Sequence, residues 1–181
     1  FDARFLGFIT VVGLFSLGNS SNAFLLLKAA HVGMSPAWIS GCYLVFNAVY
    51  AVVSIPGGIL ADRFGKRRMI VGGFGLFSGV YAGFALATTP WQIAGLFVLY
   101  GIYMGLTEGV QRAYVATLVP KKRTATGFGL YHMVVGIAIL PASLLAGLLW
   151  DSIGPAAPFW FGAGTAASAA IFFAGVSRKY S

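Results

Sequence analysis

The sequence predicts an all-α membrane protein that crosses the bilayer six times. Of its 181 residues, 59% are hydrophobic and only 9% are charged, and its mean hydropathy is +0.86. A soluble domain usually has about 25% charged residues, so this chain is too apolar for that class. Its apolar residues are also gathered into six long runs, and a run of about 20 such residues is long enough to span a bilayer as a helix.

Short links that contain proline, glycine or basic residues separate the six runs, which together form one domain over residues 1–181. Pro141 lies inside the fifth run, where it removes a helix hydrogen bond and is expected to kink the helix. Gly75, Gly79 and Gly83 recur at four-residue spacing in the third run, a pattern that predicts close packing against a neighbouring helix. The predicted spans are residues 5–30, 37–61, 69–88, 91–119, 126–150 and 158–176.

The Lys and Arg residues of the links lie in alternate links, so they all fall on one side of the predicted protein. The opposite links, 33–36, 88–90 and 151–158, contain neither residue type. Because basic links stay in the cytoplasm, we expect both termini to be cytoplasmic and the membrane to be a bacterial inner membrane. The formal net charge of +8 therefore indicates topology and contact with lipid, and not binding of nucleic acid. The basic link positions are Arg4, Arg63, Lys66, Arg67, Arg68, Lys121, Lys122, Arg123, Arg178 and Lys179.

The reactive residue types show no pattern typical of an enzyme or a metal site. Cys42 is the single cysteine, which excludes an intramolecular disulfide. No Cys or His cluster has metal-ligand spacing, and no nucleophile and base arrangement or phosphate loop is found. We therefore expect no enzymatic activity, no metal and no cofactor. The run 5–30 is too long for the apolar segment of a signal peptide, and the start at Phe1 without Met leaves open a longer protein.

The link 58–68 combines ordered glycines with charged residues. Gly58 leaves room for another helix to approach, and Gly65 permits a turn that a side chain would obstruct. Asp62 is placed to cap the following helix or to pair with an arginine. Basicity alone would explain the Lys and Arg residues of a cytoplasmic loop, but it would not explain the ordered Gly and Asp.

This link resembles the signature loop that joins helices two and three in the major facilitator superfamily. The resemblance implies one six-helix half of that fold, with a 3+3 inverted repeat, in which the first and fourth helices line the central cavity. The run from Glu108 to Gly127, together with the polar stretch 18–21, is more similar to a C-terminal half than to an N-terminal half. The resemblance also implies a cytoplasmic conformational latch, formed here by Gly58, Asp62, Arg63, Gly65, Arg67 and Arg68.

The fifth run has a second, partial resemblance, to the proton antiporters of the same superfamily. Gly127, Gly136 and Pro141 match the glycine and proline spacing of their fifth-helix motif. Leu140 stands where that motif has the glycine before the proline. The resemblance favours antiport without deciding between antiport and symport.

Two charged residues lie deep in the fourth run. At about 1.5 Å per residue, Glu108 is roughly 18 Å from the cytoplasmic end of its helix, and Arg112 shares its face one turn nearer the cytoplasm. A lone charge at this depth costs at least about 2.5 to 3.5 kcal/mol, so we expect the two to neutralise each other. Glu108 is predicted to exchange a proton or cation, while Arg112 either controls the proton affinity of Glu108 or meets an anionic group of the substrate. The alternative is an ion pair that only fixes helix packing or that joins the network of the Asp62 loop.

Neutral polar residues add to these candidates. Asn19 and Asn22 interrupt the first run three residues apart, and Gln111 precedes Arg112. We predict contact with substrate or ion, with hydrogen bonding between helices as the alternative. The first and fourth runs open two successive groups of three, which is where an inverted repeat places matching cavity-lining segments. His132, in the fifth run, is interpreted as a packing residue in preference to a proton site.

These features predict a transporter that moves a small solute by alternating access, coupled to the proton gradient. Six helices supply one wall of a cavity, so a second half is expected from a homodimer, a separate chain or another part of the same polypeptide. The alternative is a membrane interaction or assembly module that keeps the fold and does not transport. The expected partners are a small solute, protons, membrane lipid and the second half, and the sequence does not identify the solute.

Overall fold

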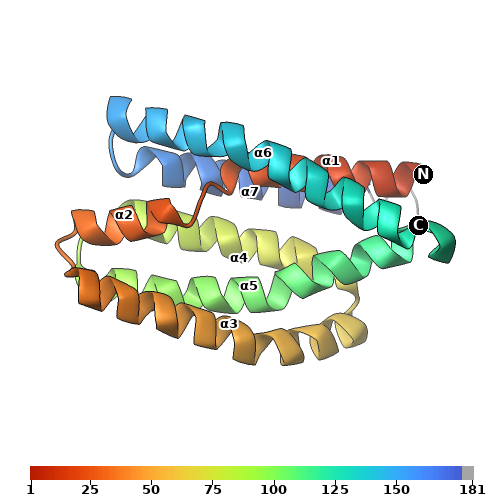
Figure 1. Cartoon of the computed structure of the whole chain (residues 1–181), viewed down its shortest axis with the longest axis horizontal. Helices are drawn as coiled ribbons and strands as arrows, with labels where there is room; N and C mark the ends of the chain where they lie inside the picture. Colours follow the sequence, from red (N-terminus) through yellow and green to blue (C-terminus); the bar gives the residue numbers. More distant parts are fainter. Residues whose placement is uncertain (177–181) are drawn as a thin grey trace.

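The computed structural model describes residues 1–176, and no strand occurs in this range. Six apolar helical spans run back and forth along the long axis, as Figure 1 shows. The prediction of an all-α membrane protein with six spans is confirmed, and the tail charges at Arg178 and Lys179 lie outside the described residues. The helices are α1 (Ala3–Gly18), α2 (Ala23–His31), α3 (Pro36–Phe64), α4 (Lys66–Leu86), α5 (Pro90–Leu118), η1 (Lys121–Arg123), α6 (Thr124–Ser152) and α7 (Ala157–Val176).

The first span is not one continuous helix, as the sequence analysis expected, but two. α1 ends at Gly18 and α2 begins at Ala23, and the polar residues 19–22 form an irregular connection between them. Asn and Ser side chains compete with helical hydrogen bonds for the backbone; here the Ser21 hydroxyl accepts from the Ala23 N–H at 3.3 Å. Irregular backbone at membrane depth is tolerated where it lines a cavity or is buried in protein.

Local sequence explains where the other helices begin and end. Ser35 caps α3 through a bond from the Trp38 N–H to its hydroxyl, and Thr89 forms a capping box with Gln92 at the start of α5. Gly65 separates α3 from α4 at a φ of +92°, a conformation that L side chains rarely adopt. The turn expected at Gly65 is therefore present, and Figure 1 shows it at the same end of the molecule as the N-terminus and η1.

Of the three glycines predicted to pack, Gly83 does approach a neighbouring helix, since a Cβ added there would lie 2.6 Å from Leu96 Cδ2 on α5. The rest of α4 packs mainly through aromatic side chains. Phe77 stacks on Tyr81 with ring centroids 3.9 Å apart, and Phe74 stacks on Phe15 of α1 at 4.2 Å. Gly75 and Gly79 face away from the bundle, and a Cβ added to either would meet nothing within 4 Å among the described residues. The packing predicted for those two glycines is therefore wrong, because the bulky buried residues of α4 occupy the opposite face.

The backbones of α3 and α5 approach each other closely. A Cβ added to Gly101 would lie 2.7 Å from the Phe46 carbonyl oxygen, and one added to Gly57 would lie 2.6 Å from the Gly105 carbonyl oxygen. Small residues at such a seam let two membrane helices come together where lipid supplies no hydrophobic force. Because Tyr50 is on α3 and Glu108 is on α5, this seam fixes the distance between their side chains.

Candidate functional site

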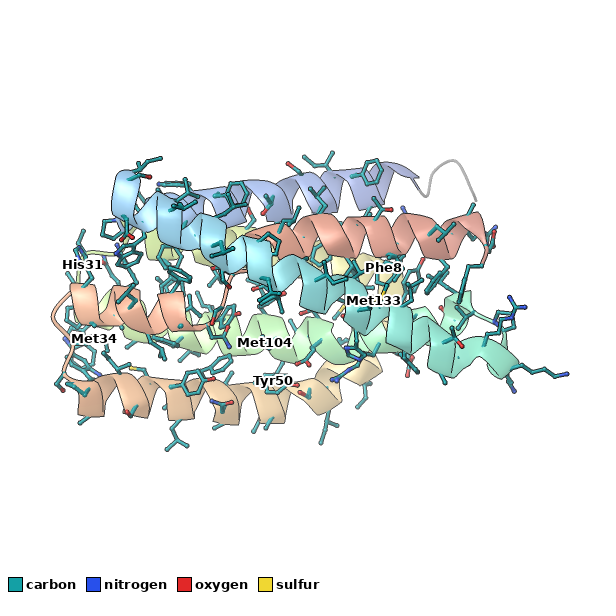
Figure 2. The ribbon with its side chains drawn as sticks, turned by 45° about the horizontal axis from the view of Figure 1, so that its top comes forward. Phe8, His31, Met34, Tyr50, Met104 and Met133 are labelled. Atoms are coloured by element: carbon teal, nitrogen blue, oxygen red, sulfur yellow. The ribbon has the colours of Figure 1, made fainter. Side chains whose placement is uncertain are left out.

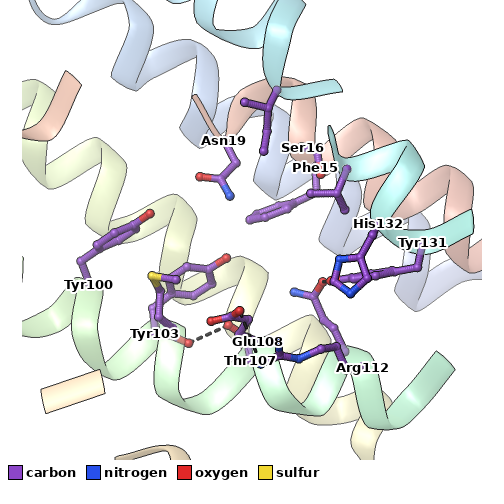
Figure 3. Close-up of a pocket in the computed structure, with 14 residues that line it drawn as sticks. Phe15, Ser16, Asn19, Tyr100, Tyr103, Thr107, Glu108, Arg112, Tyr131 and His132 are labelled. Atoms are coloured by element: carbon purple, nitrogen blue, oxygen red, sulfur yellow. Dashed lines mark hydrogen bonds and ion pairs between the residues drawn. The ribbon is translucent and has the colours of Figure 1, made fainter. Parts of the chain in front are cut away.

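A cavity of about 270 Å³ lies between α1, α5 and α6. Figure 3 shows Asn19, Ser16 and Phe15 on one wall and Glu108 and Arg112 on the facing wall, with Tyr131 and His132 beside them. Two further pockets, of about 430 and 460 Å³, are lined mainly by apolar residues at helix ends and contain no charged side chain. The cavity is lined by Phe15, Ser16, Asn19, Tyr100, Tyr103, Met104, Thr107, Glu108, Gln111, Arg112, Tyr131, His132, Val135 and Ile139.

Glu108 is held by two neighbours. The Tyr50 hydroxyl donates to its Oε2 at 2.6 Å, and the Arg112 Nη2 lies 3.4 Å from its Oε1. Figure 2 shows Tyr50 between α3 and α5. The Glu108 and Arg112 side chains remain 37% and 43% exposed, so both charges reach the cavity. The expected i,i+4 pair is therefore present, and the carboxylate is reinforced from a second helix.

Two further hydrogen bonds join the helices around the cavity. The Tyr131 hydroxyl of α6 donates to Gln111 Oε1 of α5 at 3.0 Å, and the Tyr100 hydroxyl of α5 donates to Asn22 Oδ1 at 2.9 Å. The second bond ties α5 to the residue that caps α2. Polar contacts of this kind hold helices together in a bilayer, and the bond from Tyr131 also orients the Gln111 amide at the cavity.

The structure brings four of the five predicted binding residues to one cavity: Asn19, Glu108, Gln111 and Arg112. Asn22 does not line it, because its side chain is turned toward Tyr100. His132, interpreted from the sequence as a packing residue, does line the cavity. Contact of any of these residues with a solute or proton stays a prediction.

Sequence reasoning missed the tyrosines that complete the site. Tyr50, Tyr103 and Tyr131 lie on α3, α5 and α6, within runs that are mostly apolar in the sequence. A tyrosine in an apolar run is as consistent with packing in the core as with a role at a polar site. Only the approach of α3 to α5 shows that Tyr50 meets Glu108.

In the predicted latch, Asp62 has a different partner from those expected. Within residues 1–176 it neither caps α4, whose N-cap is Gly65 without a side-chain bond, nor pairs with an arginine. Instead Lys66 Nζ lies 2.9 Å from Asp62 Oδ1, because the spacing of four residues places the two side chains side by side across Gly65. Gly58 also differs from expectation: a Cβ there would meet nothing within 4 Å, and it is Gly57 that contacts α5.

Arg67 links the latch to the far end of the chain. Its Nη2 donates to the carbonyl oxygens of Phe173 and Ala174 at 3.3 and 3.0 Å, in the last turn of α7. The guanidinium also lies 5.8 Å from the centroid of the Phe173 ring. The last carbonyls of a helix have no partner within the helix, so a cation there is well placed. Arg63 and Arg68, the remaining latch arginines, are exposed.

We expect Arg67→Gln to loosen the contact between α4 and α7. Glutamine cannot supply a charged donor to both carbonyls, and hydrogen bonds with a charged partner contribute more than neutral ones. The expected loss is about 1–2 kcal/mol, measured as a lower unfolding temperature in detergent and faster hydrogen exchange at the end of α7. Arg68→Gln is the matched control, since it removes the same charge from an exposed neighbour. An equal effect of both changes would contradict the assignment to Arg67.

The cavity offers no metal site of the usual kind. Within residues 1–176, no group of three or more His, Cys, Asp or Glu side chains lies together. The chemistry that the arrangement permits is proton exchange at Glu108 and hydrogen bonding or ion pairing to a small solute through Arg112, Gln111, Ser16 and Asn19.

Comparison with known proteins shows the family to which this chain belongs. The family model described as Major Facilitator Superfamily matches residues 6–181. The chain belongs to the major facilitator superfamily. This result confirms the family that the 58–68 link indicated, and the chain is an integral, multi-pass membrane protein of a transporter family. The chain spans less than half the length of the curated relatives that it matches.

Three relatives illustrate the range of this superfamily. An uncharacterized MFS-type transporter of Methanocaldococcus jannaschii is 38% identical over 86% of this chain and 40% of its own length. A Na(+), Li(+), K(+)/H(+) antiporter of Planococcus maritimus is 28% identical over 63% of this chain and 28% of its own length. A probable anion transporter, chloroplastic, of Arabidopsis thaliana is 30% identical over 72% of this chain and 26% of its own length.

Proposed function

We propose that this chain is one half of a secondary transporter that moves a small solute by alternating access and couples it to protons at Glu108. The observation that carries the proposal is the position of that carboxylate. Of the four acidic residues in the chain, Asp2 precedes α1, Asp62 and Asp151 lie in the last turns of α3 and α6, and Glu108 lies inside α5 at the cavity. An ionisable residue within the membrane that faces a cavity is a functional candidate by default.

The need for a second half is supported by the faces that the six helices leave uncovered. The α3 and α6 spans are only 17% buried, against 44% for the α4 and α5 spans. Their outward positions are apolar, as in Val52, Ile55, Leu140 and Leu144, each at least 70% exposed. α6 also forms one side of the cavity. A second six-helix unit that packed against these faces would cover the side of the cavity that the six helices leave open. The relatives are more than twice as long as the matched region, which is enough for a second unit.

The pattern of helix contacts supports a 3+3 repeat. α1 packs on α6 and α7, α5 packs on α3 and α4, and α4 packs on α7. In a 3+3 repeat the first span corresponds to α5, α3 to α6 and α4 to α7. Under this correspondence the contacts of α1 with α6 and α7 match those of α5 with α3 and α4, and the contact of α4 with α7 matches itself. The first span and α5 are then equivalent, and both contribute polar residues to the cavity, as repeat interfaces do in transporters.

We place the end that carries Arg4, the 58–68 link and η1 in the cytoplasm, because basic links are retained there. The latch then lies at the cytoplasmic mouth of the half. Arg67 holds α4 to α7 at that end, and a contact that exists in one conformation only would bias the equilibrium between inward-open and outward-open states.

The alternative is an interaction or assembly module that has the same fold and does not transport. Proteoliposomes containing the purified protein and an internal pH dye separate the two. Addition of sodium, potassium, alanine, glucose, choline or benzoate is expected to move protons for at least one of these solutes in wild type, and for none in Glu108→Gln. If proton movement in wild type is identical to that in the variant and in protein-free liposomes for all of these solutes, the transport proposal is wrong.

We expect the purified chain to associate in detergent as two copies when no other half is present. The exposed apolar faces of α3 and α6 would be covered by the second copy. The measurement is the protein mass from light scattering with detergent subtracted. Replacing Leu140 and Leu144 by glutamine is expected to shift the mass toward one copy, and the same replacement at Leu86, exposed on α4, is the control. A single-copy mass for wild type would contradict self-association.

A further inference from the structure

The cavity contains more hydrogen-bond donors than the chain itself uses. Gln111 is only 6% exposed, and its Oε1 accepts from Tyr131, which leaves the two N–H groups of its amide for the cavity. Ser16 is 3% exposed and lines the cavity, and among the described residues no hydrogen bond to its hydroxyl is found. Buried polar groups are normally hydrogen-bonded, so both side chains are prepared for a partner that enters the cavity.

Arg112 adds charged donors at the same place. A guanidinium has five N–H groups, and the contact with Glu108 is made by Nη2 at 3.4 Å, which is long for a charge-assisted hydrogen bond. The side chain is 43% exposed and lines the cavity. Gln111, the neighbouring residue on α5, lines the same cavity, so both side chains offer donors to it.

The carboxylate of Glu108 and the amide oxygen of Gln111 lie, in contrast, next to donors of the chain itself. Glu108 Oε2 accepts from Tyr50 and Oε1 faces Arg112, while Gln111 Oε1 accepts from Tyr131. A cationic solute would have to compete with these internal donors for the same oxygens. A solute with an oxyanion would instead meet free donors, and its apolar body would lie against Phe15, Tyr103 and Met104.

We propose that the solute of this site is a small organic anion whose oxyanion group is held by Arg112 and Gln111, with Ser16 and Asn19 on the facing wall. This inference rests on the proposed transport function and adds the chemical class of the solute. Bidentate pairing with a planar guanidinium is the usual mode by which proteins recognise a carboxylate.

The Glu108–Arg112 pair links this anion to a proton. A proton on Glu108 removes the negative charge that attracts Arg112, so the guanidinium is released to the oxyanion. Anion and proton therefore bind together, and each strengthens binding of the other by the same factor. The other titratable or charged groups around Glu108 come from three helices. They are Tyr100, Tyr103 and Arg112 on α5, Tyr50 on α3, and Tyr131 and His132 on α6. The α1 wall contributes Phe15, Ser16 and Asn19, which do not titrate.

The test uses three probes with the same ring and different charge: benzoate, benzamide and benzylamine. Binding of each to the purified chain in lipid nanodiscs is measured by equilibrium dialysis over a pH range in which benzoate stays ionised. We expect saturable binding of benzoate that strengthens as the pH falls, and weaker or no binding of the neutral and cationic probes.

Two variants and one control connect the binding to the named residues. Arg112→Gln is expected to weaken benzoate binding roughly tenfold or more, as loss of a charge-assisted pair does. Glu108→Gln is expected to bind benzoate as well at high pH as wild type does at low pH, because Arg112 is then free throughout. Lys122→Gln removes one positive charge from the exposed η1 and is expected to bind as wild type does.

The outcomes separate this inference from the proposed function. If benzylamine binds in preference to benzoate, or if none of the three probes saturates, the anion site is wrong whatever the protein transports. If Arg112→Gln and Lys122→Gln weaken benzoate equally, the binding is a general effect of charge and the site is also wrong. If benzoate binds as described but never moves across a proteoliposome membrane, the anion site stands and the transport function fails.

Discussion

A sudden pH step on one side of the reconstituted protein is expected to displace charge in wild type and to displace none in a Glu108→Gln variant. Glu108 is the one acidic residue of the chain that lies away from the helix ends, so its protonation moves charge through part of the membrane field. Glutamine has nearly the same shape, and its amide oxygen still accepts from Tyr50, so the fold is expected to remain. The measurement is the transient current of proteoliposomes adsorbed on a solid-supported membrane.

The control for this experiment is Asp151→Asn. It makes the same change from carboxylate to amide in an exposed side chain in the last turn of α6, where protonation displaces little charge across the bilayer. We expect its transient current to equal that of wild type. A current that survives in Glu108→Gln and disappears in His132→Gln would show that the histidine of the cavity carries the proton, and would contradict the role given to Glu108.

Gly101→Ala is expected to cause the largest loss of stability among single-methyl changes in α5. The added Cβ would lie 2.7 Å from the Phe46 carbonyl oxygen and 3.1 Å from Val49 Cβ, and backbone atoms cannot rotate away as a long side chain can. Overpacking of this kind usually costs about 1–3 kcal/mol. Because α3 would be displaced from α5, the bond between Tyr50 and Glu108, 2.6 Å long in the structure, is also expected to lengthen.

Gly109→Ala is the matched control, since it adds the same methyl group to the same helix where nothing lies within 4 Å. Alanine is favoured over glycine in a helix by about 0.5–1 kcal/mol, so this variant is expected to be as stable as wild type or more so. The unfolding temperature in detergent measures both. Equal temperatures for the two variants would mean that the α3–α5 seam is looser than the structure has it.

The sequence determined the fold because membrane insertion depends on local composition. Six apolar runs and their basic links are sufficient to place six spans, since an unpaired backbone has no alternative to a helix in hydrocarbon. The charged link at 58–68 identified the family, which the family match over residues 6–181 confirmed. Glu108 and Arg112 were recognisable because a charge in an apolar run is costly and therefore conspicuous.

The sequence predicted less well where the outcome depends on which face of a helix meets a neighbour. The glycines of α4 match the spacing of a packing motif, yet Gly75 and Gly79 point away from the bundle and Gly101 and Gly57 form the close contact instead. A small residue permits another helix to come close, but its spacing in the sequence does not show which helix packs against it. The break between α1 and α2 was also missed, because a polar stretch such as 19–22 is compatible with a continuous helix until its backbone finds other bonds.

By itself, then, the sequence determined the number of spans, the family, and the i,i+4 pairing of Glu108 with Arg112 in α5. Only the tertiary structure decided that Tyr50 from α3 holds Glu108, that Tyr131 orients Gln111, and that Arg67 reaches the end of α7. The physical reason is that hydropathy is a property of each segment alone, whereas a hydrogen bond between residues 58, 20 or 107 positions apart exists only after helix packing has set the distance.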